Sequence, residues 1–260
     1  MLSYNEIKQF QEFLLNAWPA EHYYFLNGWI LRFNHGVTYR ANSVIPIRYF
    51  GNLDQLENDI EIVEKAYMSY GISSTFTMHD YFEPENLDTL LKKRGYVEHD
   101  YTNALMSSID KFSFPKNNQN LVYEIYDERI KKFSKLLAKY TQRDKFQQEV
   151  IDQIAKRIVV PKKCFIIAKK DKKVVGTVMG VLNPYGYVYV ADLFVLPMYR
   201  RSGIASSLMA TLIDDWAILK GAHHVWLQVE KDNTPAMKFY SNLGMEKAYN
   251  YYYLSKEFQS

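Results

Sequence analysis

The fold is decided by one stretch of the chain, Val190-Ala191-Asp192-Leu193-Phe194-Val195-Leu196-Pro197-Met198-Tyr199-Arg200-Arg201-Ser202-Gly203-Ile204-Ala205. It begins as an apolar run, which is typical of a buried strand. Pro197 has no N–H to donate to a sheet ladder, so it ends this strand. A short basic loop with Gly203 follows, and an amphipathic helix begins directly at Ile204. The stretch therefore predicts a strand, a loop and a helix in immediate succession.

The start of this helix has the features of an anion-binding site. The first N–H groups of a helix have no partner within it and lie at the positive end of the helix dipole. This first turn contains no carboxylate, and two arginines precede it. The residues concerned are Arg200, Arg201, Ser202, Gly203, Ile204, Ala205 and Ser206. The pattern predicts a phosphate or pyrophosphate site, and the alternative is that Gly203 serves only as a turn residue.

Hydrophobic periodicity divides the rest of the chain into two similar halves. In the first half, helices are predicted at 4–15, 53–70 and 86–93, and strands at 23–26, 29–33, 37–45, 74–78 and 101–106. In the second half, helices are predicted at 127–140, 143–157, 204–220 and 235–243, and strands at 165–169, 174–182, 187–195, 224–229 and 249–254. The dipeptide Asn27-Gly28 between the first two strands predicts a tight hairpin.

Three landmarks recur in one order at nearly one offset, which indicates a duplicated domain. They are Val44-Ile45-Pro46 with Val195-Leu196-Pro197, Gly71 with Gly221, and Gly95 with Gly244. The alternative is that glycines after helices are common in any chain of helices and strands. The polar segment 113–120 predicts a linker, so we expect a first domain at 1–112 and a second at 121–260.

Composition excludes several classes of protein. The 260 residues are 48% hydrophobic and 16% aromatic, which provides a packed core and excludes a disordered chain. A formal net charge of +3 is too small to indicate a nucleic-acid partner. The longest mostly apolar run, 174–182, is too short to span a bilayer, and the first residues lack the pattern of a signal peptide. The single cysteine, Cys164, excludes an intrachain disulfide, so we expect a cytoplasmic protein without a membrane partner.

Two motifs of the second half resemble those of the GNAT superfamily of N-acyltransferases. Arg200-x-x-Gly203-x-Ala205, after a strand that ends in Phe-Val-x-Pro, is similar to the acyl-CoA signature of this superfamily. Asn233-x-x-Ala236-x-x-Phe239-Tyr240-x-x-x-Gly244-Met245 is similar to its closing motif. The resemblance covers about residues 121–255. It implies an α+β chain with the α/β three-layer GNAT fold, in which a mixed, mostly antiparallel sheet is flanked by helices, here duplicated in tandem.

The resemblance also implies a donor and the residues that hold it. The donor would be acetyl-CoA or a close relative, bound where two neighbouring parallel strands separate, and the acceptor would be an amine. Backbone groups of Leu193, Phe194 and Val195 would hold the pantetheine and polarise the thioester carbonyl. The segment from Arg201 to Ser206 would hold the pyrophosphate, and Asn233 would contact the pantetheine arm or the reacting region.

The resemblance suggests a proton donor, whereas the general base stays open. Tyr240 matches the tyrosine that often protonates the departing thiolate, and a phenol with a pKa of about 10 is protonated at neutral pH. The alternative is an ordinary amphipathic tyrosine, since the chain has 22 tyrosines. Glu230 and Asp192 are candidate bases, because Gln228 stands where some relatives carry an acid. Each could act through water or be a paired structural carboxylate, and a neutral amine would need no protein base.

The first half departs from these motifs where they carry chemistry. Arg48-x-x-Gly51 is superficially similar to the loop, but three acids follow it: Asp54, Glu57 and Asp59. Acids in the first turn of a helix satisfy its N–H groups and repel a pyrophosphate. Pro84 and Leu91 replace the two polar residues of the closing motif. We therefore expect a degenerate copy that binds no CoA and walls one side of the acceptor cleft.

The sequence thus predicts an acetyl-CoA-dependent N-acetyltransferase that moves an acetyl group to a primary amine by direct attack on the thioester. The alternatives are a non-catalytic acyl-CoA-binding or regulatory module and an interaction scaffold. No metal site is expected, because His223 and His224 have no Cys or acidic partner at metal-ligand spacing. The identity of the amine acceptor, the length of the acyl chain and the oligomeric state stay open.

Overall fold

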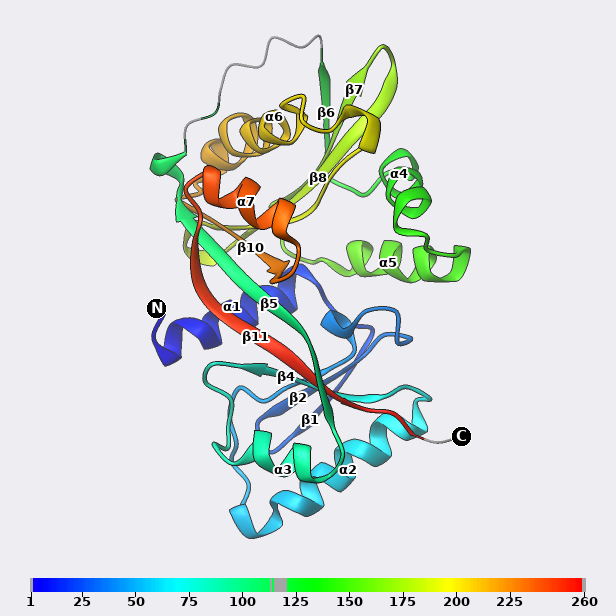
Figure 1. The fold of residues 1–260 in the computed structure, drawn as a ribbon, viewed down its shortest axis with the longest axis vertical. Coiled ribbons are helices and arrows are strands. Elements are labelled where there is room, and N and C mark those ends of the chain that lie inside the picture. The colour runs from blue at the N-terminus through cyan, green and yellow to red at the C-terminus, as the bar shows by residue number, and fades with distance from the viewer. Residues whose placement is uncertain (1, 113, 115–120, 259–260) are drawn as a thin grey trace. The chain divides into compact units, whose positions relative to one another are not determined.

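The computed structural model describes residues 2–112, 114 and 121–258, and the chain forms two compact units (Figure 1). Unit 1 consists of Met1–Ala104, Val229–Asn233 and Lys247–Ser260, and unit 2 of Leu105–Gln228 and Thr234–Glu246. Each unit therefore combines segments that are distant along the chain, whereas the expected domains 1–112 and 121–260 follow the sequence repeat. The predicted linker 113–120 lies outside the described residues except for Phe114. In the described part of the chain, every helix is too short or too polar to cross a membrane.

Unit 1 is built on a sheet with the strand order β1-β2-β3-β4-β11-β5. Its helices are α1 (Tyr4–Ala17), α2 (Leu56–Ser69) and α3 (Leu87–Lys93), with 3₁₀ turns at Tyr39–Ala41 and Leu53–Gln55. Its strands are β1 (His22–Leu26), β2 (Trp29–Phe33), β3 (Val44–Ile45), β4 (Ser74–His79), most of β5 (Val97–Ser108) and nearly all of β11 (Glu246–Lys256). Asn27 and Gly28 have φ angles of 46° and 91°, which confirms the predicted tight hairpin between β1 and β2.

The predicted strand at 37–45 is wrong for most of its length, since only β3 pairs in the sheet. Asn42 organises the preceding loop instead. Its Oδ1 accepts hydrogen bonds from the N–H groups of Asn34 (2.6 Å) and Gly36 (3.0 Å). Its Nδ2 donates to the carbonyl oxygens of Asn34 (3.2 Å) and Thr38 (2.8 Å). A side-chain amide that takes over backbone partners in this way favours a turn over a strand.

After an additional strand and two helices, unit 2 has the order of elements that follows α1 in unit 1: three strands, a helix, a strand and a helix. Its helices are α4 (Lys131–Thr141), α5 (Lys145–Arg157), α6 (Ile204–Ala210), which continues through a π segment at Thr211–Ala217, and α7 (Thr234–Asn242). Its strands are β6 (Val122–Tyr126), β7 (Lys163–Lys170), β8 (Lys173–Asn183), β9 (Tyr187–Val195), most of β10 (His224–Glu230) and the end of β5. Strand β9 is parallel to β10, and β6 to β9 are antiparallel in succession. The predicted mixed, mostly antiparallel sheet flanked by helices is confirmed.

Two glycines of β8 let helix α6 lie close to the sheet. A Cβ at Gly176 would come within 2.9 Å of Leu208 Cδ1 and 2.8 Å of the Phe194 carbonyl oxygen. A Cβ at Gly180 would come within 2.5 Å of Leu212 Cδ1. Helix α6 therefore packs directly on the strand that supports β9, and its N-terminus lies close to the end of β9.

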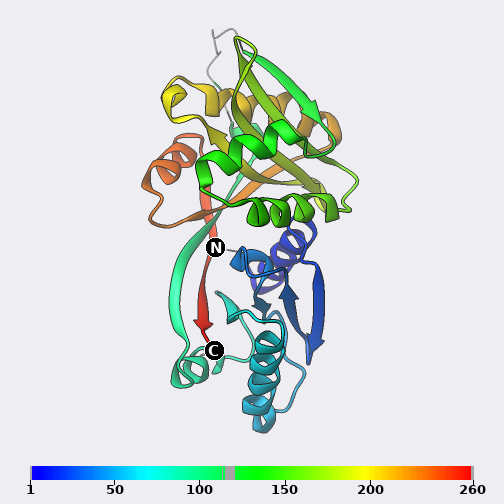
Figure 2. The same cartoon turned by 90° about the vertical axis from the view of Figure 1, so that its right-hand side faces the viewer.

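The last strand of the chain belongs to unit 1. Strand β11 pairs antiparallel with β4, from Tyr251↔His79 to Lys256↔Ser74. It also lies beside β5, as Figures 1 and 2 show. The strand predicted at 249–254 is therefore present, but its partners are strands that begin in the first half of the chain.

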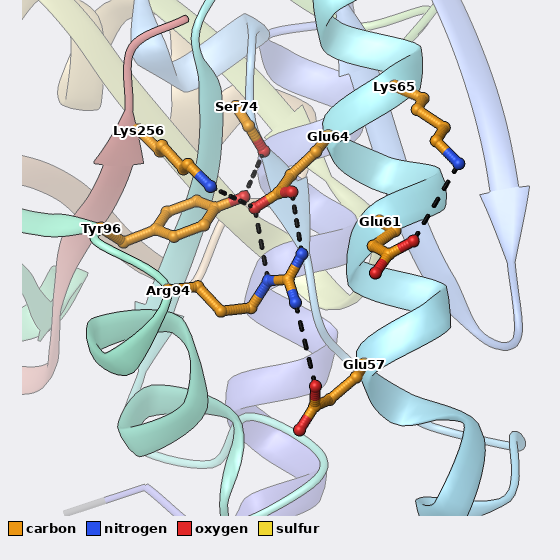
Figure 3. Close-up of polar contacts among 8 residues, drawn as sticks. All are labelled: Glu57, Glu61, Glu64, Lys65, Ser74, Arg94, Tyr96 and Lys256. Carbon is orange, nitrogen blue, oxygen red and sulfur yellow. Dashed lines mark hydrogen bonds and ion pairs between the residues drawn. The ribbon is translucent and has the colours of Figure 1, made fainter.

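Charged side chains fix the end of β11 in unit 1 (Figure 3). Glu64 on α2 accepts hydrogen bonds from Arg94 Nη2 (3.0 Å) and Lys256 Nζ (3.1 Å). Burial alone would raise the pKa of Glu64, but these two donors outweigh it and hold that pKa below its usual range. Tyr96 and Ser74 share a hydrogen bond of 2.7 Å beside this pair. The end of the last strand is thereby tied to helix α2.

Candidate active site

Strands β9 and β10 separate in the middle of unit 2. Their parallel pairing ends at Val190↔Leu227, although β9 continues to Val195. On its other side β9 stays paired with β8 through a bulge at Asp192 and Leu193. The β10-facing edge of β9 beyond Val190 therefore has no strand partner in the described part of the chain. Its main-chain N–H and C=O groups are available to a ligand, except the Val195 carbonyl, which accepts a hydrogen bond from Arg200 Nε (3.2 Å).

Asp192 anchors this bulge. Its φ of 52° is an uncommon conformation that Asp tolerates, and its carbonyl oxygen accepts a hydrogen bond from Thr177 Oγ1 (3.0 Å). Its carboxylate forms an ion pair with Arg129, with 2.6 Å between Oδ2 and Nη1, and the Arg129 side chain is only 2% exposed. Arg129 also binds Asp152 Oδ1 through Nε (2.9 Å). These contacts favour the paired structural carboxylate over the general base for Asp192.

Helix α6 begins without a cap. Its N-cap residue, Gly203, has a φ of 80° and offers no side chain, and the first turn holds no acid. The first intrahelical bond runs from Ser207 N–H to the Gly203 carbonyl (3.0 Å). Helices α1 and α5, in contrast, both begin with a complete capping box. The N–H groups of Ile204, Ala205 and Ser206 therefore have no acceptor among the described residues.

The surroundings of this helix start leave room for an anion. A Cβ on Gly203 would meet no atom within 4 Å, so the glycine is required for its positive φ and not for packing. Arg201 is exposed, also has a positive φ (58°), and forms no ion pair with any residue that the structure describes. Arg200 instead turns back to β9, where its Nε donates to the Val195 carbonyl (3.2 Å). Of the two arginines, Arg201 is the one available to a phosphate.

Tyr240 lies on α7, and its hydroxyl is held in the protonated form. Burial, together with the neighbouring hydroxyl of Tyr189, raises the pKa of Tyr240 above its usual value. Tyr189 is the residue before Val190, at which the pairing of β9 with β10 ends. The structure therefore brings Tyr240 close to the point where the two strands separate. A phenol that stays protonated there can donate a proton.

Glu230 and Asn233 belong to unit 1 by their contacts. Both are exposed, and the N–H of Asn233 donates to the Glu230 carbonyl (3.1 Å) in the turn after β10. Glu230 lines a cavity of about 390 Å³ together with Asp100, Tyr101, Lys231 and Asp232. The structure thus groups the predicted donor site, Asp192 and Tyr240 in unit 2, and it does not bring Glu230 or Asn233 to them within that unit.

The corresponding helix of unit 1, α2, has the opposite chemistry at its N-terminus. Glu57 and Asp59 lie in its first turn. Asp59 is only 4% exposed, and its Oδ2 accepts hydrogen bonds from Tyr49 Oη (2.7 Å) and Asn27 Nδ2 (2.8 Å). The first turn of α2 therefore carries two acids, one of them buried, which would repel an anion, and this agrees with a degenerate copy.

The remaining residues that could bind a metal or act as a nucleophile, the histidines and Cys164, have surroundings typical of structural residues. The described residues contain no group of three His, Cys, Asp or Glu side chains that could hold a metal ion. The ring of His224 stacks on Tyr187, with 4.8 Å between centroids. Cys164 is fully buried, and burial raises the pKa of its thiol, so it is a poor nucleophile.

Sequence reasoning missed Arg129 and Arg143, which lie around the bulge. Arg129 stands in the charged run Asp127-Glu128-Arg129, a pattern typical of a solvated loop. Arg143 precedes Asp144, the N-cap of α5. A single sequence carries no signal that separates such residues from exposed arginines, because only the fold buries them.

Two family models match the chain in succession. Residues 122–245 match the acetyltransferase (GNAT) family. Residues 122–245 form a GNAT domain. Residues 5–123 match a model described as the C-terminal part of the probable histone acetyltransferase Rv0428c. The resemblance inferred from the two motifs is thereby confirmed, and the protein that contains this domain is an acyltransferase enzyme.

Some relatives match this chain over both halves. The uncharacterized N-acetyltransferase YobR of Bacillus subtilis is 27% identical over 97% of this chain and 99% of its own length. A GCN5-related N-acetyltransferase from Kribbella flavida has a similar structure, with a TM-score of 0.65 at 12% identity over 97% and 96% of the two chains. A tandem GNAT protein from the clavulanic acid biosynthesis pathway has a TM-score of 0.57 at 12% identity over 82% and 74%. At these identities the two structures show a shared fold.

Proposed function

We propose that this protein transfers an acetyl group from acetyl-CoA to a primary amine. The observation that supports it most directly is the uncapped start of α6 next to the open edge of β9. Three N–H groups, the open space above Gly203 and the unpaired Arg201 together fit an anion of the size of a pyrophosphate. A neutral ligand would leave this concentration of positive charge without a partner.

The open edge of β9 would hold the rest of the donor. Main-chain groups of Leu193, Phe194 and Val195 bind the amide groups of the pantetheine as a neighbouring strand would. An N–H group of this edge polarises the thioester carbonyl and stabilises the oxygen as it becomes negative. The bulge at Asp192, fixed by Arg129, sets the direction of these groups.

The chemistry requires one nucleophile and one acid. The amine nitrogen attacks the thioester carbon, a C–N bond forms and the C–S bond breaks. Tyr240 donates its proton to the departing thiolate and recovers a proton from solvent. An ammonium first loses a proton to become nucleophilic, whereas a neutral amine does not. In both cases the nitrogen loses one proton to water after the attack, and the amide forms. Glu230 is the remaining candidate base for a water-mediated transfer, because the carboxylate of Asp192 is already bound to Arg129.

Unit 1 would contribute no donor site, because Glu57 and Asp59 in the first turn of α2 would repel a pyrophosphate. We propose that this degenerate copy binds no CoA. The single cysteine fits a reducing compartment, and we therefore propose a cytoplasmic location.

The test is a panel of primary amines with acetyl-CoA in which release of the free thiol is followed. Gly203→Glu places a carboxylate at the proposed phosphate site and abolishes both acetyl-CoA binding and turnover. Gly221→Glu is the matched control, because Gly221 ends the same helical segment with a φ of 89° and also has no atom within 4 Å of an added Cβ. It carries the same backbone strain at the opposite end of the helix and leaves acetyl-CoA binding intact.

The outcomes separate the proposed enzyme from its rivals. Thiol release that depends on an amine and is lost only in Gly203→Glu supports the proposal. Tight binding of acetyl-CoA without turnover of any amine supports a regulatory acyl-CoA-binding module. Absence of binding in the unmodified protein contradicts both and leaves an interaction scaffold.

A further inference from the structure

Two arginines and two aspartates gather beside the bulge of β9 in unit 2. Arg129 lies just before α4, Arg143 between α4 and α5, Asp152 on α5 and Asp192 on β9. Arg129 binds both aspartates, through Nη1 to Asp192 (2.6 Å) and through Nε to Asp152 (2.9 Å). The Oδ1 atom of Asp152 also accepts hydrogen bonds from Ser134 Oγ (2.7 Å) and Gln148 Nε2 (2.8 Å).

Two guanidinium nitrogens of this cluster lack a hydrogen-bond acceptor among the described residues. Arg129 Nη2 and Arg143 Nη1 are both buried and have no hydrogen-bond acceptor in the part of the chain that the structure describes. Arg143 forms no hydrogen bond or ion pair there at all, although it is partly buried. A guanidinium stays charged in a protein, and a buried charged donor without an acceptor is destabilising. The two nitrogens therefore lack an oxygen that would complete the site.

The position of these nitrogens is next to the proposed thioester strand. The ring of Tyr140, near the end of α4, contacts the ring of Phe194 on β9, with 5.5 Å between centroids. The chain then turns at Gln142, which has a φ of 55°, and Arg143 follows. Burial lowers the pKa of Arg143, and the charges of Asp192 and Asp152 oppose this effect, so Arg143 faces the same cluster as Arg129. Arg143 therefore lies beside the part of β9 to which the proposed function assigns the thioester.

We propose that Arg143, assisted by Arg129 Nη2, binds a carboxylate of the acceptor, so that the acceptor is an amine that also carries a carboxylate, as amino acids do. This inference rests on the proposed function. A guanidinium and a carboxylate match in geometry and form two parallel hydrogen bonds. The two aspartates balance the two arginines in formal charge, so the site attracts an oxygen through its two unsatisfied N–H donors and not through net charge. A monoanion is therefore repelled less there than a dianion. A phosphate dianion would be repelled by Asp152 and Asp192.

The experiment compares amines that differ only in the carboxylate. Each common amino acid is assayed with acetyl-CoA beside its carboxamide and its decarboxylated amine. Arg143→Gln is expected to raise the KM of the amino acid by about 10–100-fold, because a hydrogen-bonded charge pair of this strength is lost. It leaves the KM of the decarboxylated amine and of acetyl-CoA unchanged. Lys145→Gln is the control, because this substitution also removes one positive charge. Lys145 is two residues from Arg143 along the chain, and its side chain is 92% exposed.

The result that would overturn the inference is equal use of the amino acids and their decarboxylated amines, or an equal effect of Arg143→Gln on both. In that case the two nitrogens bind water only, and the proposed acetyl transfer stands. If no amine is turned over, binding of the amino acids to the unmodified protein and to Arg143→Gln is measured by NMR titration. Binding that requires Arg143 supports the site, and binding that is absent or independent of Arg143 refutes it. Failure of the proposed acetyl transfer is recognised separately, because no free thiol is then released with any amine.

Discussion

Removal of the Arg129 charge is the most direct test of how the bulge of β9 is held. Arg129→Met keeps much of the side-chain volume but leaves Asp192, which is 14% exposed, and Asp152, which is 31% exposed, without their cation. Loss of one partner of a buried ion pair typically destabilises by about 3–5 kcal/mol. Asp152 keeps two other donors, so we expect the lower end, about 3 kcal/mol, or a Tm lower by roughly 6–12 °C.

The free energy of unfolding is measured by urea denaturation, and a double-mutant cycle isolates the pair. Asp192→Asn is the second change, because Asn also tolerates a positive φ. The two substitutions should be coupled by at least about 1.5 kcal/mol. Lys135→Gln, on the exposed side of α4, removes one positive charge and should change stability by less than about 0.5 kcal/mol. A cost of Arg129→Met below about 1 kcal/mol, or additive effects in the cycle, would refute the reasoning.

Three further outcomes follow from the structure. Tyr240→Phe should lower kcat by roughly 10²–10⁴-fold at every pH. The pKa of Tyr240 is raised, so ionisation of Tyr240 should not lower the rate of the unmodified enzyme up to a pH of about 10. A pH–rate profile of both proteins measures this. Calorimetry of the full chain should give one CoA site and not two, and Gly203→Glu should remove it. The lowered pKa of Glu64 stabilises the fold above its ordinary value of 4.5, and this contribution is lost as the pH falls through the folded-state pKa. Glu64→Gln should therefore lower stability by up to about 1 kcal/mol at neutral pH and by less in acid, which denaturation at several pH values would show.

The local features of the fold could be predicted from the sequence because short-range chemistry determines them. Asn27-Gly28 specifies a hairpin since both residues accept a positive φ. Pro197 ends β9, and Gly203 opens α6, at the residues where the sequence places them. The uncapped start of α6 also depends only on neighbouring residues, because Gly203 offers no side chain and the first turn contains no acid.

The partners of the last strand could not be predicted in the same way. The alternation of buried and half-buried residues in Tyr251-Tyr252-Tyr253 is compatible with pairing to strands of either unit. The choice of β4 depends on contacts distant along the chain, such as the hydrogen bonds of Lys256 and Arg94 with Glu64. For the same reason Arg129 and Arg143 carry no signal in the sequence, since their burial arises only when α4, α5 and β9 come together.

The proposed function assigns a donor site to one copy of the fold and none to the other. Helices α2 and α6 occupy equivalent places in the order of elements, yet the first turn of α2 carries two acids and that of α6 carries none. The last strand of the chain belongs to unit 1, which needs Lys247–Ser260 to complete its sheet. A fragment that ends near residue 115 would therefore lack β11, and its failure to bind CoA would carry no information. The absence of a second donor site has to be established on the intact chain.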